Sequence, residues 1–215
     1  MQNLKLLILL LFLALIVFAT MLIIRSYNPS ETFQLAEQKE LAEIAEIKSL
    51  LGEAYSLLQE NEFNAAEKRL HLLLRKAPRN ITALQMLGNV YFIQKKYADA
   101  EKTFSTLTIL DPQRSIHYNN LGQAFAAQEK YADAIQALKK AGILSPEKPQ
   151  PHLNLAEIYI KLGHKKNALN ELKKAFELGK KEKSIVINFD AFESLKNEKE
   201  FQELLHINNS NGGAK

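Results

Sequence analysis

Apolar residues are distributed in two different ways along this 215-residue chain. From Leu6 to Ile24 they form one run whose only polar member is Thr20. Beyond residue 30 they recur every three or four positions, which is the spacing of one face of an amphipathic helix. The pattern therefore predicts an apolar helix at the N-terminus followed by a series of amphipathic helices.

The N-terminal run is long enough to cross a bilayer. A helix over residues 6–24 would measure about 28 Å, close to the thickness of the hydrocarbon core. Lys5 and Arg25 flank the run, and Tyr27 follows at headgroup level. We therefore predict an uncleaved transmembrane anchor. A cleaved signal peptide and a buried soluble helix are the alternatives; the run continues beyond the candidate cleavage site at 17–19, which favours the anchor.

Charge around the run indicates its orientation only weakly. The α-amino group and Lys5 precede the run, and Arg25 and Lys39 follow it, so the positive charges balance. Anchors with a basic start and a long following domain commonly translocate that domain. We predict a single-pass protein of a bacterial inner membrane with the following domain in the periplasm; in a mitochondrial outer membrane that domain would face the cytosol.

One period, of about 34 residues, organises the chain after Ile47. Four columns recur at this interval, and each keeps one character: proline, alanine, a small residue, or a large apolar residue. The columns are Pro78, Pro112 and Pro146; Ala66, Ala100, Ala134 and Ala168; Ala54, Gly88, Gly122 and Ala156; and Leu70, Phe104, Leu138 and Leu172. A period of this length indicates a solenoid of stacked units.

Each unit is predicted to form two helices, for example Ile81–Gln94 and Tyr97–Leu110. Gly88 lets the two helices approach closely, and Phe104 fills the space beside it. Pro112 ends the second helix because it lacks an N–H and restricts the residue before it. One pair cannot bury its apolar face alone, so we expect about four pairs to stack into a right-handed array. The first helix of each pair would form the concave face.

The columns resemble the tetratricopeptide-repeat (TPR) family pattern, Leu-Gly-x2-Tyr followed by Ala, Phe and Pro. The residues that match it best are Leu87, Gly88, Tyr91, Ala100, Phe104 and Pro112. The resemblance extends from Ile47 to about Gly179, and the outer repeats depart from it, with Glu53 in place of leucine and Lys180 in place of proline. With the anchor, it implies an all-α fold: a TPR helical-hairpin solenoid with an N-terminal transmembrane helix and a C-terminal capping segment.

The same patterns give the expected domain boundaries. Residues 31–60 read as one long helix or two nearly collinear ones, with Ser30 as the N-cap. The segments are the anchor 1–27, a linker helix 28–46, the array 47–180 (repeats of about 47–80, 81–114, 115–148 and 149–180), a cap 181–207 and a disordered tail 208–215.

The segment after the array is expected to cover its exposed apolar end. Residues 186–189 are short and β-branched, which predicts an extended stretch, and two short helices follow. Their apolar residues are Phe192, Leu195, Phe201, Leu204 and Leu205. The segment resembles the stretches that close some TPR arrays, and a partner-binding tail is the alternative.

Composition and charge narrow the chemistry. Removing Lys5 and Arg25 from the count leaves 26 basic against 24 acidic side chains, too small an excess to indicate nucleic acid. The absence of cysteine excludes disulfides and thiol nucleophiles. The five histidines are scattered and no catalytic motif occurs, so we expect no enzyme, no small-molecule substrate, no cofactor and no metal. His152 takes a core position and is expected to be a partly buried packing residue.

Polar residues of the first helices are the candidate binding residues. In the repeat register they face or rim the groove, and they are Gln85, Asn89, Asn119, Asn120, Gln123, Asn154 and Glu157. An amide both donates and accepts, so it can pair with an extended peptide backbone, and the arrangement resembles the asparagines with which TPR proteins hold peptides. The family's carboxylate clamp needs cations where this chain has Gln85, Gln150 and Asn154, so no terminal-carboxylate ligand is expected. Ordinary solvated surface residues are the alternative.

These patterns predict a membrane-anchored interaction scaffold or assembly factor. Its groove would bind a peptide or helix of a partner protein, and residues 6–24 would contact the membrane. The resemblance implies an assembly or quality-control role. The alternative is a permanent structural subunit of a larger membrane complex.

Overall fold

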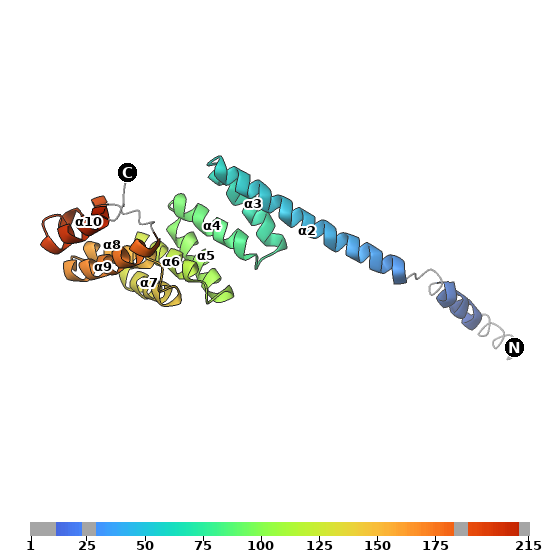
Figure 1. Cartoon of the computed structure of the whole chain (residues 1–215). Helices are drawn as coiled ribbons and strands as arrows, with labels where there is room; N and C mark the ends of the chain where they lie inside the picture. The colour runs from blue at the N-terminus through green and yellow to red at the C-terminus, as the bar shows by residue number, and fades with distance from the viewer. Residues whose placement is uncertain (1–11, 23–28, 183–188, 211–215) are drawn as a thin grey trace, which may run out of the picture. The chain divides into compact units, whose positions relative to one another are not determined.

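A computed structural model describes residues 12–22, 29–182 and 189–210, and every regular element in these ranges is helical (Figure 1). The chain forms two compact units, residues 1–49 and 50–215. Helix α2 (Pro29–Gln59) belongs to both, as one continuous helix where one or two were expected. The predicted N-cap Ser30 lies within its first turn, because the helix already begins at Pro29.

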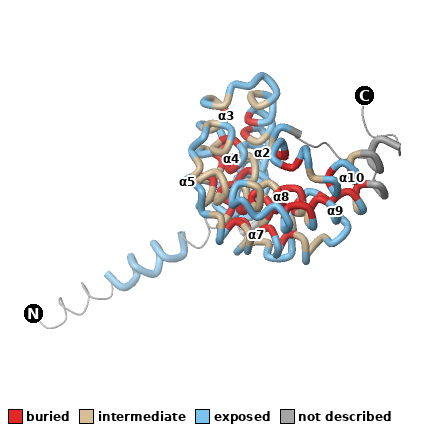
Figure 2. The backbone as a smooth tube through the Cα atoms, turned by 90° about the vertical axis from the view of Figure 1, so that its left-hand side faces the viewer, coloured by how far each residue is buried: buried red, intermediate tan, exposed pale blue. Residues whose placement is uncertain are grey.

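The first unit corrects the predicted localisation. Residues 12–22 are helical and exposed (Figure 2), and at 1.5 Å per residue they extend about 17 Å, little more than half of a bilayer core. Helix α2 is longer, but glutamates and lysines interrupt it throughout. Among the described residues no helix is both long and apolar enough to cross a membrane. The prediction of a single-pass inner-membrane protein with periplasmic repeats is therefore wrong; residues 6–11 and 23–24 of the predicted anchor lie outside the described residues.

The second unit consists of helices whose ends repeat at the period seen in the sequence. After α2 the chain forms α3 (Phe63–Lys76), α4 (Ile81–Ile93), α5 (Tyr97–Leu110), α6 (Ser115–Ala127), α7 (Tyr131–Leu144), α8 (Gln150–Lys161) and α9 (Lys165–Glu182). From α3 to α9 each helix contacts the next, so successive pairs stack (Figure 1). The predicted all-helical solenoid is confirmed, as is the expected pair at 81–94 and 97–110.

Close approach of the two helices in a pair depends on the small-residue column. A Cβ atom added at Gly88 would lie 2.5 Å from Cε1 of Phe104, and one added at Gly122 would lie 2.6 Å from Cγ of Leu138. Phe104 and Leu138 are themselves fully buried. The glycines therefore let the facing large residue pack directly against the helix backbone, as the repeat pattern predicted.

The turn within each pair places one residue in the left-handed region. Asn61, Lys95 and Glu129 each have φ of 60°, and Gly163, at the equivalent position, has φ of 73°. The residue that follows donates its N–H to a carbonyl in the preceding helix, for example Lys96 N to Tyr91 O at 2.8 Å. This is the Schellman closure, for which glycine is best suited because a Cβ is strained at positive φ.

The C-terminal segment covers the apolar end of the last pair. It forms a 3₁₀ helix, η1 (Phe189–Leu195), and α10 (Lys199–Ser210). Its buried residues Phe192, Leu195, Phe201 and Leu204 join one core cluster with side chains of α8 and α9.

Two boundaries of this segment differ from those expected. Of the stretch predicted to be extended, 186–188 lie outside the described residues, and Phe189 begins the 3₁₀ helix. Helix α10 continues to Ser210, into the tail 208–215 that the sequence predicted to be disordered, and 211–215 lie outside the described residues.

Two matched glycine substitutions test the left-handed turn. Gly163→Ala should lower the free energy of unfolding by about 1 kcal/mol, because the new Cβ meets no neighbour and acts only through φ. Gly52→Ala, at an exposed position of α2, should raise it by about 0.5–1 kcal/mol through helix propensity. Urea unfolding of the full chain measures both. Shifts in the same direction would contradict the assigned turn.

A second pair tests the close approach. Gly122→Leu should overpack the contact with Leu138 and lower the free energy of unfolding by on the order of 1–3 kcal/mol. Gly142→Ala is the control, because its new Cβ would meet nothing nearer than 3.8 Å. Equal melting temperatures for the two variants would show that the register is wrong.

Candidate functional site

A groove runs across the first helices of three successive pairs. One hollow of about 210 Å³ is lined by Asn89, Phe92, Ile93, Phe104, Asn120 and Gln123. A second, also about 210 Å³, is lined by Phe92, Gln123, Ala126, Ala127, Leu138, Asn154, Glu157, Ile158 and Lys161. Because the hollows share Phe92 and Gln123, they form one surface, called here the α4–α6–α8 groove.

The lining of this groove follows from the repeat itself. Asn89, Gln123 and Glu157 occupy one position in three successive repeats, and Asn120 and Asn154 share another. Ile93, Ala127 and Lys161 form a third column one helical turn after the first. Stacking equivalent helices therefore places equivalent positions side by side.

Five of the seven candidate residues line the groove and two do not. Asn89, Asn120, Gln123, Asn154 and Glu157 contribute to the hollows. Gln85 and Asn119 belong to α4 and α6 but line neither hollow.

Asn119 and Asn154 form an internal amide pair. Asn154 Nδ2 donates to Asn119 Oδ1 at 2.9 Å, and Gln150 Nε2 donates to Asn154 Oδ1 at 3.1 Å. Both asparagines are buried. Their hydrogen bonds fix α6 against α8, so these amides serve packing before they can serve a ligand.

The other three groove amides have no partner in the part of the chain that the structure describes. Asn89 is exposed and Asn120 and Gln123 are half-buried. Within the described ranges no hydrogen bond is formed by any of the three side chains. Each offers a donor and an acceptor to a bound molecule.

The charged residues that line the groove lie at its α8 end. Glu157 is half-buried, and burial raises the pKa of its carboxyl group while the positive charge of Lys161 partly opposes that shift. Lys161 lies one turn further on and lines the same hollow. The place of Lys161 in the column of Ile93 and Ala127 is the signal in the sequence that identifies it as a groove residue.

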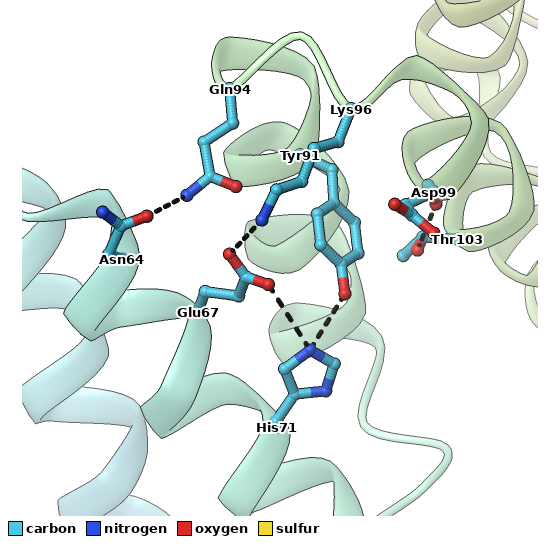
Figure 3. Close-up of polar contacts among 8 residues, drawn as sticks. All are labelled: Asn64, Glu67, His71, Tyr91, Gln94, Lys96, Asp99 and Thr103. Atoms are coloured by element: carbon cyan, nitrogen blue, oxygen red, sulfur yellow. Dashed lines mark hydrogen bonds and ion pairs between the residues drawn. The ribbon is translucent and has the colours of Figure 1, made fainter.

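A second group of polar contacts lies between the stacked pairs (Figure 3). Lys96 Nζ donates to Glu67 Oε2 at 2.8 Å, Gln94 Nε2 donates to Asn64 Oδ1 at 2.9 Å, and the Tyr91 hydroxyl lies 2.9 Å from His71 Nε2. Burial acts to raise the pKa of Glu67, but the hydrogen bond and positive charge of Lys96, with a smaller influence of Gln94, outweigh it and lower that pKa.

The contact between glutamate and lysine recurs one repeat later. Lys130 Nζ and Gln128 Nε2 both donate to Glu101 Oε2 at 2.7 Å. These two groups of hydrogen bonds, at Glu67 and at Glu101, are called here the polar brackets. Each polar bracket joins the second helix of one pair to the turn of the next pair, so it fixes how the pairs stack. Sequence reasoning missed it, although the glutamate, the glutamine and the lysine all recur at the period of the columns.

Two histidines of the array, His152 and His117, are partly or fully buried, and each lies near an acidic side chain of the array. His152 is partly buried, as expected, and its Nδ1 lies 2.6 Å from Glu171 Oε2, within hydrogen-bonding distance. His117 is buried, and its Nε2 is 3.7 Å from Asp111 Oδ2, too far for a hydrogen bond. Across the described part of the chain, no three His, Asp or Glu side chains gather as metal ligands would.

Comparison with family models decides the family. Models described as "Tetratricopeptide repeat" match residues 51–115, 86–149 and 125–184, which together span more than half of the chain. The chain belongs to the tetratricopeptide repeat family. The resemblance inferred from the repeating columns is thus confirmed, and the TPR array is a protein–protein interaction scaffold.

Solved structures show the same fold. "MamA 41-end from Desulfovibrio magneticus RS-1" has a TM-score of 0.61 and 23% identity over 64% of this chain and 78% of that one. "Crystal structure of MamA protein" has a TM-score of 0.64 and 18% identity over 79% of this chain and 97% of that one. No curated protein matches the sequence. At these identities the likeness concerns the fold alone.

The buried histidine predicts a pH dependence of stability. Burial lowers the pKa of His117, although nearby Asp111 partly opposes this and Arg114 reinforces it. The unfolded chain therefore binds a proton below about pH 6.5 while the folded chain stays neutral at this site, so stability falls as pH drops below that value. Urea unfolding should show a smaller fall between pH 7 and 5 for His117→Leu than for the native chain.

The control for this test is exposed His164. His164→Asn should retain the native pH dependence. An equal fall for the native chain and His117→Leu would exclude His117 as the source.

Proposed function

We propose that this protein is a scaffold that holds an extended peptide segment of a partner protein in the α4–α6–α8 groove. The observation that supports this is the row of Asn89, Asn120 and Gln123, which line a continuous hollow surface and have no partner among the described residues. Their amides would pair with peptide backbone groups, and the apolar parts of the hollows would take side chains.

The dimensions of the groove suit a short segment. Packed helices lie about 8–10 Å apart, so three successive first helices span roughly 16–20 Å. An extended chain rises about 3.3 Å per residue, which gives a bound segment of about five or six residues. Such a segment can come from a terminus or an exposed loop of the partner.

A permanent structural subunit is the second candidate. Ile109 and Ile143 are 77% and 73% exposed at equivalent positions of α5 and α7, outside the groove lining. Two such side chains would suit a lasting contact on the second helices. Scattered exposed apolar residues are common on protein surfaces, however, so the groove is the stronger proposal.

Alanine substitutions separate the two candidates. Replacing Asn89, Asn120 and Gln123 together should leave helicity intact, because none of them supports the fold through a side-chain hydrogen bond. Each lost bond to a partner is worth about 0.5–1.5 kcal/mol, so bound partner should fall at least tenfold. Immobilised full-length chain, native or substituted, is incubated with host lysate, and the retained proteins are quantified by mass spectrometry.

The control replaces three exposed amides of α7 and α9, Gln136, Asn167 and Asn170, with alanine. This variant should retain the same proteins as the native chain. If the groove variant also retains them in equal amount, the groove is not the binding surface. If the retained proteins are lost from a variant with Ile109→Ser and Ile143→Ser but not from the groove variant, the structural subunit would be favoured.

A further inference from the structure

The α8 end of the groove combines an apolar hollow with one unusual carboxylate. Phe92, Ala126, Ala127 and Ile158 supply apolar lining in a space of about 210 Å³, room for one bulky side chain. Glu157 lines the same hollow and is half-buried. The hollow therefore presents an apolar wall and a carboxylate to whatever occupies it.

Glu157 differs from the other partly buried glutamates of the array. Glu67 binds Lys96, Glu101 binds Lys130, and Glu171 binds Lys174 and His152. Glu157 takes part in no hydrogen bond or ion pair that the described residues form, and Lys161 acts on it only through its charge.

The pKa shifts of these carboxyl groups also separate the glutamates that have a partner from Glu157. In Glu67, Glu101 and Glu171 burial acts to raise the pKa, but their partners outweigh it, so the pKa is lowered. In Glu157 burial dominates and the pKa is raised. A half-buried carboxylate without a partner carries part of the cost of desolvation, and an incoming cation would relieve that cost.

We propose that Glu157 selects a peptide that carries a lysine or arginine next to an apolar residue. The apolar side chain would occupy the hollow of Phe92, Ala126, Ala127 and Ile158, and the cation would bind the Glu157 carboxylate. This inference rests on the proposed peptide function and adds the chemical class of the ligand.

Lys161 provides a further test of the proposal, because its charge competes with a peptide cation for the Glu157 carboxylate. It stands four residues after Glu157 on α8, the spacing at which side chains of a helix meet. To bind the Glu157 carboxylate, a peptide cation must compete with the positive charge of Lys161. Removing the Lys161 charge should therefore strengthen the preference for basic peptides, whereas a structural role for Lys161 would weaken all binding alike.

Peptide selection tests the inference without a known partner. A random library of twelve-residue peptides displayed on phage is selected on the full chain, native or substituted. The native chain should enrich lysine or arginine beside an apolar residue. The strongest peptide, resynthesised and titrated by fluorescence anisotropy, should bind Glu157→Gln on the order of tenfold more weakly, the loss expected for a charge-assisted hydrogen bond.

Two further variants complete the design. Lys161→Ala should bind the same peptide severalfold more tightly. Glu147→Gln, in the exposed loop after α7, removes the same charge outside the groove and should bind it as the native chain does.

The outcomes separate this inference from the proposed function. Enriched peptides without basic residues that still need Asn89, Asn120 and Gln123 would overturn the role of Glu157 and leave the peptide groove standing. The same holds if basic peptides bind Glu157→Gln as tightly as the native chain. No enrichment over an unrelated bait, or binding that survives loss of the three amides, would overturn both.

Discussion

The structure of the array depends on direct contact between a large side chain and a helix backbone. Phe104 packs against Gly88 and Leu138 against Gly122, at distances that leave no room for a Cβ. This contact sets how closely the two helices of a pair approach. Because it recurs in successive repeats, it also gives neighbouring pairs the same shape, and equal shapes can stack into one continuous core.

The groove is a consequence of that stacking. When equivalent helices lie side by side, the columns of Asn89, Ile93 and Asn120 each become a row on one surface. The polar brackets at Glu67 and Glu101 fix the junctions between pairs and so help to hold the rows in place. The proposed binding surface therefore needs no element beyond the repeats themselves.

The sequence predicted the fold well because every column states the same period. Helix ends, small residues and buried partners all repeat at one interval, so one register explains them together. The N-terminal prediction had no such support: it rested on the hydropathy of one segment, and the structure corrected it.

The candidate site was less predictable than the fold, because residues at equivalent positions of one column differ in their hydrogen bonds. Asn120 and Asn154 are equivalent by register, but Asn154 is bonded to Asn119, whereas the residue that corresponds to Asn119 one repeat earlier is the longer Gln85. The neighbour on the adjacent helix thus decides whether an amide is satisfied internally. Glu157 likewise looks like any charged helix residue in the sequence, and only the structure shows that no described residue forms a hydrogen bond or ion pair with it.

The most direct test of the account is site-specific photocrosslinking in the native host. The full chain carries p-benzoylphenylalanine in place of Ile93, which lines the groove and is 53% exposed, or in place of Ile143, which is 73% exposed on α7. Irradiation should give discrete adducts with partner protein from position 93 and none from position 143. Adducts from position 143 with none from position 93 would contradict the claim that the α4–α6–α8 groove is the binding surface.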